Sequence, residues 1–239
     1  MKLFRLPGVH RPVSDTWLLA GAMRREITPG ARVADICTGT GALAISAARA
    51  GAGTVVGVDL THRAVFCARL NARLNRAPVE IRRGDLFGPL AGERFDVIVS
   101  NPPYIPAETD RLPRRGATVP LDAGLDGRAL LDRICREAPD HLVTGGAILV
   151  VHSSICGTEK TTEALSGVGL SVDVVLRRPG QLGPVMTARA AMMRERGLLG
   201  PDDIEEIVVV RGRLTDRPAG PAAGTALKAA GVGGDGAID

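Results

Sequence analysis

Short apolar runs alternate with stretches of helical spacing along most of this chain, and no other feature constrains the fold as much. Strands are predicted at residues 32–36, 54–59, 79–82, 95–100, 147–152, 170–176 and 204–211. Helices are predicted between them, at residues 42–50, 61–75, 126–143, 158–166 and 185–196. A first helix, capped by Ser14 or Asp15, runs through Met23. This alternation favours an α/β fold with a doubly wound, mainly parallel sheet.

Four polar side chains are expected along one edge of that sheet. Asp35, Asp59, Asp85 and Asn101 lie on or just after the ends of the first four predicted strands. Right-handed crossovers bring the ends of parallel strands to the same edge. Open α/β sheets bind their ligands at that edge, so the sequence predicts the binding site there.

The segment Asn101-Pro102-Pro103-Tyr104 directly follows the fourth predicted strand. Two consecutive prolines can neither continue a strand nor open a regular helical turn, so the chain must leave the sheet along a fixed extended path. The Asn101 amide oxygen and the Pro102 carbonyl then form a pair of acceptors suited to a planar –NH2 group, on whose face Tyr104 can stack. The alternative is an ordinary proline-rich turn.

A glycine-rich turn at residues 35–41 joins the first predicted strand to the helix that follows it. Gly39 and Gly41 let the backbone pass close to a ligand, and the N–H groups at the helix start can hold an anionic group. Asp59 follows about 20 residues later, the spacing of an acid that binds a ribose diol. The turn also fits the dinucleotide pattern G-x-G-x-x-A, so NAD is a second possibility.

Three features favour S-adenosylmethionine over NAD. Asp35 can accept hydrogen bonds from a cationic amino group, and Asp85 suits an adenine amino group. The segment at residues 101–104 has no evident role in hydride transfer. For any single residue, a structural role explains the sequence about as well as cofactor binding does: a tight turn for the glycines, and a helix cap for Asp35 and Asp85.

With these motifs the chain resembles the class I S-adenosylmethionine-dependent methyltransferases. Among them it is most similar to the HemK-type protein-glutamine N5-methyltransferases, which act on release factors, in their shorter branch without an N-terminal helical domain. The likeness covers about residues 12–176 and the last strand, and its motifs are residues 14–19, 35–41, 101–104 and 123–128 with Asp59 and Asp85. It implies a Rossmann-like sheet of seven strands with the last strand antiparallel, and a methyltransferase domain at residues 14–213.

The resemblance also implies a role for each matching residue. Cofactor-binding residues would be Thr16, Asp35, Thr38, Gly39, Gly41, Asp59, Leu60, Asp85, Leu86 and Asn101. Of these, Thr16 and the loop glycines would contact the methionine part, Asp59 the ribose and Asp85 the adenine. Asn101, Pro102 and Tyr104 would be catalytic, and with Pro103 they would hold the amide of the substrate glutamine. The expected partners are a release factor-like protein and a small zinc-binding activator subunit, and no metal site is expected in this chain.

Two features depart from the family pattern. Cys37 stands where the family commonly has the first glycine of the turn. The segment at residues 179–201 is longer than expected before the last strand. It bears on the methyl acceptor more than on the cofactor.

Other functions remain open. The same tetrapeptide suits a nucleic-acid amino methyltransferase acting on adenine N6 or guanine N2, because a flipped base presents similar N–H groups. A predicted loop with Arg111, Arg114 and Arg115 can meet phosphates, but only 3% of residues are aromatic and no separate target-reading domain is evident. A small-molecule N-methyltransferase, with residues 185–196 as a lid, and a non-catalytic cofactor-binding subunit are further alternatives. A dehydrogenase is the most distant.

Composition and the chain ends favour a cytoplasmic protein. The four cysteines are scattered, without a C-x-x-C pair, which fits a reducing compartment. No apolar stretch is long enough to span a bilayer, so no membrane association is expected. Residues 1–13 are expected to form an irregular leader without the apolar core of a signal peptide. Residues 214–239 are rich in Gly, Ala and Pro without periodicity and are expected to be disordered.

Overall fold

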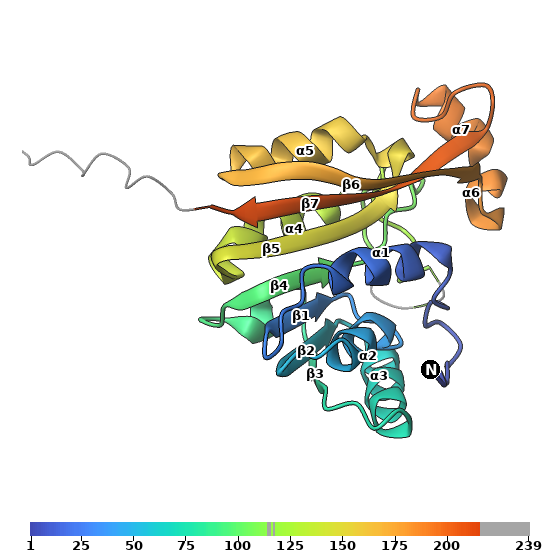
Figure 1. Ribbon diagram of the computed structural model, residues 1–239. Coiled ribbons are helices and arrows are strands. Elements are labelled where there is room, and N and C mark those ends of the chain that lie inside the picture. The colour runs from blue at the N-terminus through green and yellow to red at the C-terminus, as the bar shows by residue number, and fades with distance from the viewer. Residues whose placement is uncertain (114–115, 117, 216–239) are drawn as a thin grey trace, which may run out of the picture.

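The computed structural model describes residues 1–113, 116 and 118–215. Seven strands form one sheet in the order β3-β2-β1-β4-β5-β7-β6 (Figure 1). The strands are β1 (Arg32–Ile36), β2 (Thr54–Asp59), β3 (Glu80–Arg83), β4 (Phe95–Ser100), β5 (Leu142–Ser153), β6 (Leu170–Gln181) and β7 (Ile204–Leu214). β1 to β5 are parallel and β7 runs antiparallel to both of its neighbours, which confirms the predicted α/β sheet.

Helices cover both faces of the sheet. They are α1 (Ser14–Arg24), α2 (Ala42–Arg49), α3 (His62–Leu74), α4 (Leu131–Glu137), α5 (Thr158–Gly167), α6 (Pro184–Ala188) and α7 (Ala190–Glu195). Short 3-10 turns occur at η1 (Gly88–Leu90), η2 (Ala138–His141) and η3 (Ser154–Cys156). Among the residues that the structure describes, no helix is both long and apolar enough to cross a membrane.

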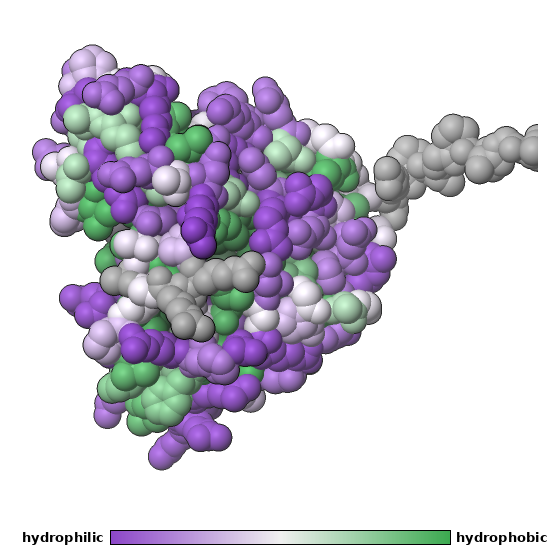
Figure 2. Space-filling view, turned by 180° about the vertical axis from the view of Figure 1, so that it is seen from behind, coloured by the Kyte–Doolittle hydropathy of each residue, from purple (hydrophilic) through white to green (hydrophobic). Residues whose placement is uncertain are grey.

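The core has two layers because the central strands are buried on both faces. Met23 of α1 and Leu43 of α2 pack on Val97 of β4 on one face. Ile98, the next residue of β4, faces the other way and packs with Ile134 of α4. Successive side chains of a strand alternate between faces, so one short apolar run supplies both layers. Seen from behind, the molecule's surface is mostly hydrophilic, with separate hydrophobic patches (Figure 2).

The predicted helix at residues 126–143 is much shorter in the structure. α4 spans only Leu131–Glu137, because Gly127 adopts a left-handed conformation at φ 78° and Asp126 accepts a hydrogen bond from the Arg128 N–H. Both features favour turns over helix. β5 begins at Leu142 instead of residue 147, and its register shifts opposite Phe95 and Val97 at the start of β4.

Three further predicted boundaries are wrong. The helix at residues 185–196 is two helices, α6 and α7, which meet at Arg189, where φ is −105° and ψ is 5°. β6 continues past residue 176 to Gln181 through Pro179, which is tolerated because β6 is an edge strand. Neither Ser14 nor Asp15 caps α1, since both lie inside it.

The first residues of the chain contain no helix or strand and run along α3. The side chain of Asn71 bonds both the N–H and the carbonyl of Phe4, and Val9 packs with Ala64 and Cys67. At the other end of the chain, Leu214 closes β7. The disorder predicted for residues 214–239 is wrong at Leu214, which lies in β7. Residues 216–239 lie outside the described residues, as do Arg114 and Arg115 of the predicted arginine loop.

Candidate active site

A cavity of about 1700 Å³ opens where β1 to β4 end. Its wall includes a residue or segment following each of these strands: Cys37, Gly39, Asp59, Leu60, Asp85, Leu86 and residues 101–104. Pockets for one small ligand typically measure roughly 300–1,000 Å³. The cavity is therefore large enough for a cofactor together with an acceptor side chain.

Asp35 holds the turn after β1 from behind the cavity wall. It is fully buried, and its Oδ2 accepts hydrogen bonds from Thr38 Oγ1 at 2.6 Å and from the Ala44 N–H at 3.0 Å. Burial raises the pKa of Asp35 to about 7. Asp35, Thr38 and Gly41 do not line the cavity. These three residues instead make contacts within the turn itself.

Three residues of this turn, Cys37, Gly39 and Gly41, have a left-handed backbone. Gly41 has φ 81°, and a Cβ there would lie 3.2 Å from Ala68 of α3, so glycine lets α2 start against α3. Cys37 has φ 64°, a conformation that glycine adopts more readily than any other residue. The Cys37 side chain packs against the core, and burial raises the pKa of its thiol far above the usual range. A thiolate at this position is therefore strongly disfavoured.

Asp59 ends β2 with its carboxylate on the cavity wall. Its Oδ2 accepts the Gly39 N–H at 3.0 Å, and its Oδ1 accepts the Thr61 N–H at 3.0 Å and the Thr61 hydroxyl at 3.2 Å. Burial raises the pKa of Asp59 by more than these hydrogen bonds lower it, so the pKa lies above its ordinary value. A carboxylate has about four acceptor positions. One position on Oδ2 is left for a ligand hydroxyl, which fits a ribose.

Asp85, after β3, pairs with Arg133 of α4. The two terminal nitrogens of the Arg133 guanidinium donate hydrogen bonds to the two carboxylate oxygens of Asp85, at 3.2 Å and 3.0 Å. Sequence reasoning missed Arg133, because an arginine in a predicted helix is ordinarily a solvated residue. Leu60 and Leu86 also line the cavity, the first exposed and the second buried. A ligand amino group at Asp85 would share the carboxylate with Arg133.

The turn after β4 lines the same cavity as the glycine turn, and it contains Asn101 and Pro102, whose oxygens are the predicted acceptor pair. Asn101 Nδ2 donates a hydrogen bond to Thr16 Oγ1 at 3.1 Å. This bond fixes the amide nitrogen on the protein side and leaves Oδ1 as the acceptor available to a ligand. Thr16 itself does not line the cavity, so the structure places it behind Asn101.

The other end of this turn is held by Asp15 of α1. Asp15 is buried, and its Oδ2 accepts the Tyr104 hydroxyl at 2.8 Å. Burial and the neighbouring Asp15 carboxylate raise the pKa of Tyr104. Sequence reasoning assigned Asp15 a capping role and so missed this contact.

Residues 123–128 support the same turn from outside. The Ala123 N–H bonds the Ile105 carbonyl at 3.0 Å, and Gly127 lies against the Tyr104 carbonyl, where a Cβ would approach to 2.4 Å. Arg128 is buried and donates to the carbonyls of Cys156 and Gly157. This motif of the sequence therefore buttresses the tetrapeptide. Across the described residues, no group of three His, Cys, Asp or Glu side chains is placed to hold a metal ion.

Comparison with known proteins agrees with this geometry. Residues 10–112 match the family model described as the methyltransferase small domain. A Methanocaldococcus jannaschii protein, provisionally named a protein N5-glutamine methyltransferase, is 36% identical over 177 residues, covering 74% of this chain and 88% of its own length. The release factor glutamine methyltransferase of Geobacter sulfurreducens is 38% identical over 60% of this chain, which spans 53% of that longer protein. The ribosomal protein uL3 glutamine methyltransferase of Bradyrhizobium diazoefficiens is 39% identical over 54% of this chain and 43% of its own length.

Solved structures support the same fold. A chain of the E. cuniculi Mtq2–Trm112 complex, which methylates the eRF1 translation termination factor, superposes with a TM-score of 0.60 at 23% identity, over 87% of this chain and 99% of that chain. A Thermus thermophilus 16S rRNA N2 G1207 methyltransferase, solved with AdoMet and guanosine, gives 0.54 at 22% identity, over 85% and 45%. Together, the sequence relatives and the placement of the Asn101 turn beside the glycine turn show that this chain belongs to the HemK-type family of class I S-adenosylmethionine-dependent N-methyltransferases.

Proposed function

We propose that this enzyme transfers the methyl group of S-adenosylmethionine to the side-chain amide nitrogen of a glutamine, in a release factor or ribosomal protein. The orientation of Asn101 carries the proposal. Because its amide nitrogen is bonded to Thr16, its Oδ1 is left to accept a hydrogen bond on the cavity wall. The relatives that act on glutamine in release factors and in ribosomal protein uL3 support this acceptor class.

The cavity wall offers positions for the ribose and the adenine of the cofactor. Asp59 retains an acceptor position for the ribose. Gly39, which lines the cavity beside Asp59, has no side chain that would obstruct the ribose. Asp85 offers its carboxylate to the adenine amino group while Arg133 holds it in place. When bound, S-adenosylmethionine supplies an electrophilic sulfonium methyl group.

The protein's contribution is to orient a weak nucleophile. An amide nitrogen reacts poorly because its lone pair is delocalised. Asn101 Oδ1 and the Pro102 carbonyl accept its two N–H bonds and so align the nitrogen with the methyl group. The same two oxygens stabilise the positive charge that develops on nitrogen as the new C–N bond forms. The electron pair of the broken methyl–sulfur bond stays on the cofactor's sulfur, and the nitrogen releases one proton to water after transfer, when its positive charge makes it acidic. Tyr104 borders the amide.

A second protein is part of the proposal. The solved Mtq2 works in a complex with Trm112, so we propose that a small partner subunit supports activity here as well. Activity of the isolated chain equal to that of the chain purified with its cellular partners would contradict this part alone.

The test is methyl transfer from labelled S-adenosylmethionine to a release factor and to ribosomal protein uL3, with the modified residue located by mass spectrometry. We expect one methyl group on a glutamine, lost when that glutamine is replaced by alanine. Asn101→Ala should nearly abolish transfer while calorimetry shows cofactor affinity within a few-fold of wild type. Label found in RNA, DNA or small metabolites instead of protein would overturn the proposal and favour the corresponding alternative acceptor.

A further inference from the structure

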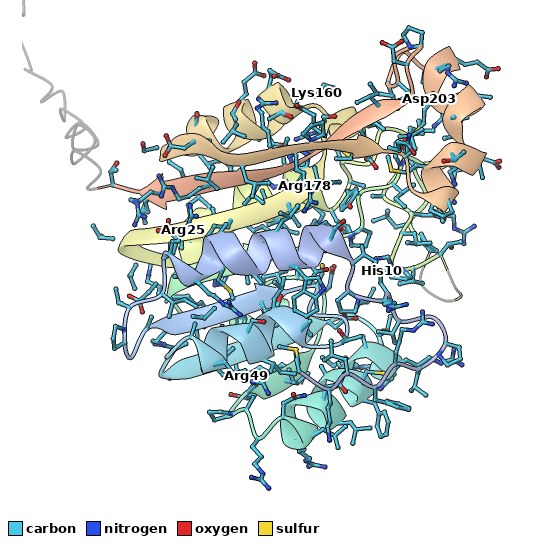
Figure 3. All side chains as sticks on the ribbon, turned by 45° about the vertical axis from the view of Figure 1, so that its right-hand side comes forward. His10, Arg25, Arg49, Lys160, Arg178 and Asp203 are labelled. Carbon is cyan, nitrogen blue, oxygen red and sulfur yellow. The ribbon has the colours of Figure 1, made fainter. Side chains whose placement is uncertain are left out.

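The segment between β6 and β7 is carried beyond the edge of the sheet. β5 stops pairing at Ser153↔Ile207, whereas β6 and β7 stay paired for three more positions, to Gln181↔Ile204. This two-stranded extension carries α6 and α7, the insertion at residues 182–203. The insertion lies at the same end of the molecule as the cavity, as Asp203 in the insertion and His10 in the cavity wall show (Figure 3).

Two arginines of the insertion bind the chain that follows the tetrapeptide. Arg189 donates to the Pro106 carbonyl at 2.8 Å and forms an ion pair with Asp122 at 2.7 Å. Arg196 donates to the carbonyls of Ala107 at 2.6 Å, Leu125 at 2.9 Å and Glu108 at 3.3 Å. Hydrogen bonds from a charged donor are stronger than neutral ones, so these contacts hold the loop firmly.

An apolar cluster adds to these bonds. Met186 and Met193 of the insertion are buried with Ile155, and Ile105 packs against them. Ile105 directly follows Tyr104 in the chain. The insertion therefore touches the tetrapeptide through a single intervening residue.

The described parts of the loop that follows the tetrapeptide, residues 105–113 and 118–125, lie between the insertion and the cavity. The two arms of the loop are joined by hydrogen bonds from the Ile105 N–H to the Leu121 carbonyl and from the Ala107 N–H to the Gly124 carbonyl. Its residues on the cavity wall include Ile105, Thr109, Arg111, Leu121 and Asp122. Within the described residues, no hydrogen bond or ion pair joins α6 or α7 to the turns after β1, β2 and β3.

We propose that the insertion fixes the wall of the cavity that receives the methyl acceptor, with Arg189 and Arg196 as positioning residues for the acceptor. The proposal rests on the proposed function for the identity of the acceptor, a glutamine-bearing protein. The cofactor side of the cavity is built from other elements. Loosening the insertion should therefore weaken acceptor binding and leave cofactor binding unchanged.

The test compares Arg196→Gln and Arg189→Gln with Arg194→Gln. Arg194 is a matched control because it lies on α7 and, among the residues that the structure describes, its side chain pairs only with Asp203, also in the insertion. We expect the KM for the protein acceptor to rise on the order of tenfold in each of the first two variants, the size expected for losing charged hydrogen bonds. The Kd for S-adenosylmethionine should stay within twofold, and Arg194→Gln should match wild type in both constants. An unchanged acceptor KM, or a parallel loss of cofactor affinity, would overturn the proposal.

A second measurement does not depend on activity. Amide hydrogen exchange at Ala107 and Ala123, whose N–H groups bond within the loop, should accelerate in Arg196→Gln and stay slow in Arg194→Gln. If wild type methylates no protein, the proposed function fails while this comparison still decides whether the insertion holds the loop. Equal exchange in all variants overturns the inference by itself.

Discussion

The hydroxyl of Tyr104 donates a hydrogen bond to Oδ2 of Asp15 at 2.8 Å, across 89 residues of sequence. The other carboxylate oxygen, Oδ1, accepts both the N–H and the hydroxyl of Thr16, and Thr16 Oγ1 accepts the Asn101 amide. Both polar side chains of the tetrapeptide are thus held by neighbouring residues of α1. The first helix of the chain is therefore part of the active site.

Asp15→Asn should lower kcat by roughly ten- to a hundredfold, because a slightly displaced acceptor pair no longer aligns the amide nitrogen. Both carboxylate oxygens of Asp15 accept hydrogen bonds, and in asparagine one of them is replaced by an NH2 group, which donates. Cofactor affinity should stay within a few-fold, since the turns that would bind it come from other elements. Steady-state kinetics and calorimetry measure both constants. An Asp15→Asn enzyme with normal kcat would show that this carboxylate is not needed for positioning.

Thr16→Val should lower kcat about tenfold, because the Asn101 amide loses the acceptor that sets its orientation. Thr16→Ser retains a hydroxyl at the same place and serves as the control, with activity near that of wild type. If Thr16→Val lowers cofactor affinity more than it lowers kcat, the threonine binds the cofactor directly, as the family resemblance implied. The orienting role would then be wrong.

The sequence was informative where one local pattern carries the information. The apolar runs of β1, β2 and β4 are buried on both faces, so their composition alone marks them as strands. The two prolines after Ser100 restrict the backbone by covalent geometry, which needs no tertiary context. The edge of the sheet that carries Asp59, Asp85 and Asn101 followed from chain order and crossover handedness.

The contacts that complete the site have no local signature. The bond between Asp15 and Tyr104, and the pairing of Arg133 with Asp85, join elements far apart in sequence. Helical spacing also overran the true start of α4, since only the left-handed backbone at Gly127 ends the pattern there. The tertiary fold decides the two contacts, so sequence reasoning could not have placed them. The start of α4 is different, because Asp126-Gly127 is a local turn signal that the prediction of a helix from residue 126 overrode.

Asp59→Ala should weaken S-adenosylmethionine binding by roughly ten- to a hundredfold, the loss expected for a hydrogen bond to a charged group. Turnover at saturating cofactor should change less, because the Asn101 turn is untouched. Isothermal calorimetry gives the Kd. Thr61→Ser is the control: it keeps the hydroxyl that bonds Asp59 Oδ1 and caps α3 at the Ala64 N–H, so neither stability nor the Kd should change. Equal Kd values for wild type and Asp59→Ala would refute the ribose assignment.

Asp35 should make the protein less stable as pH rises. Burial raises its folded pKa to about 7, above the ordinary value near 4, so the folded state binds a proton more tightly than the unfolded state does. The resulting stability is full below about pH 4 and is lost as pH rises toward 7, with a slope of up to about 1.4 kcal/mol per pH unit. Asp35→Asn cannot titrate, so the difference in unfolding free energy between wild type and variant should shrink over this range. Urea unfolding at several pH values measures it, and a constant difference would mean that Asp35 stays ionised in the fold.

Gly127→Ala should reduce both stability and kcat, because the added Cβ would lie 2.4 Å from the Tyr104 carbonyl and 2.9 Å from Cys156 Sγ. The backbone there is left-handed, with φ 78°, so the substitution also adds conformational strain. Gly145→Ala separates the two effects, since Gly145 has φ 81° but nothing within 4 Å of an added Cβ. That control should lose only about 1–2 kcal/mol of stability and no activity. A larger fall in Tm together with lower kcat in Gly127→Ala would show that residues 123–128 act by fixing the Tyr104 backbone, whereas equal effects in the two variants would leave only local strain as the cause.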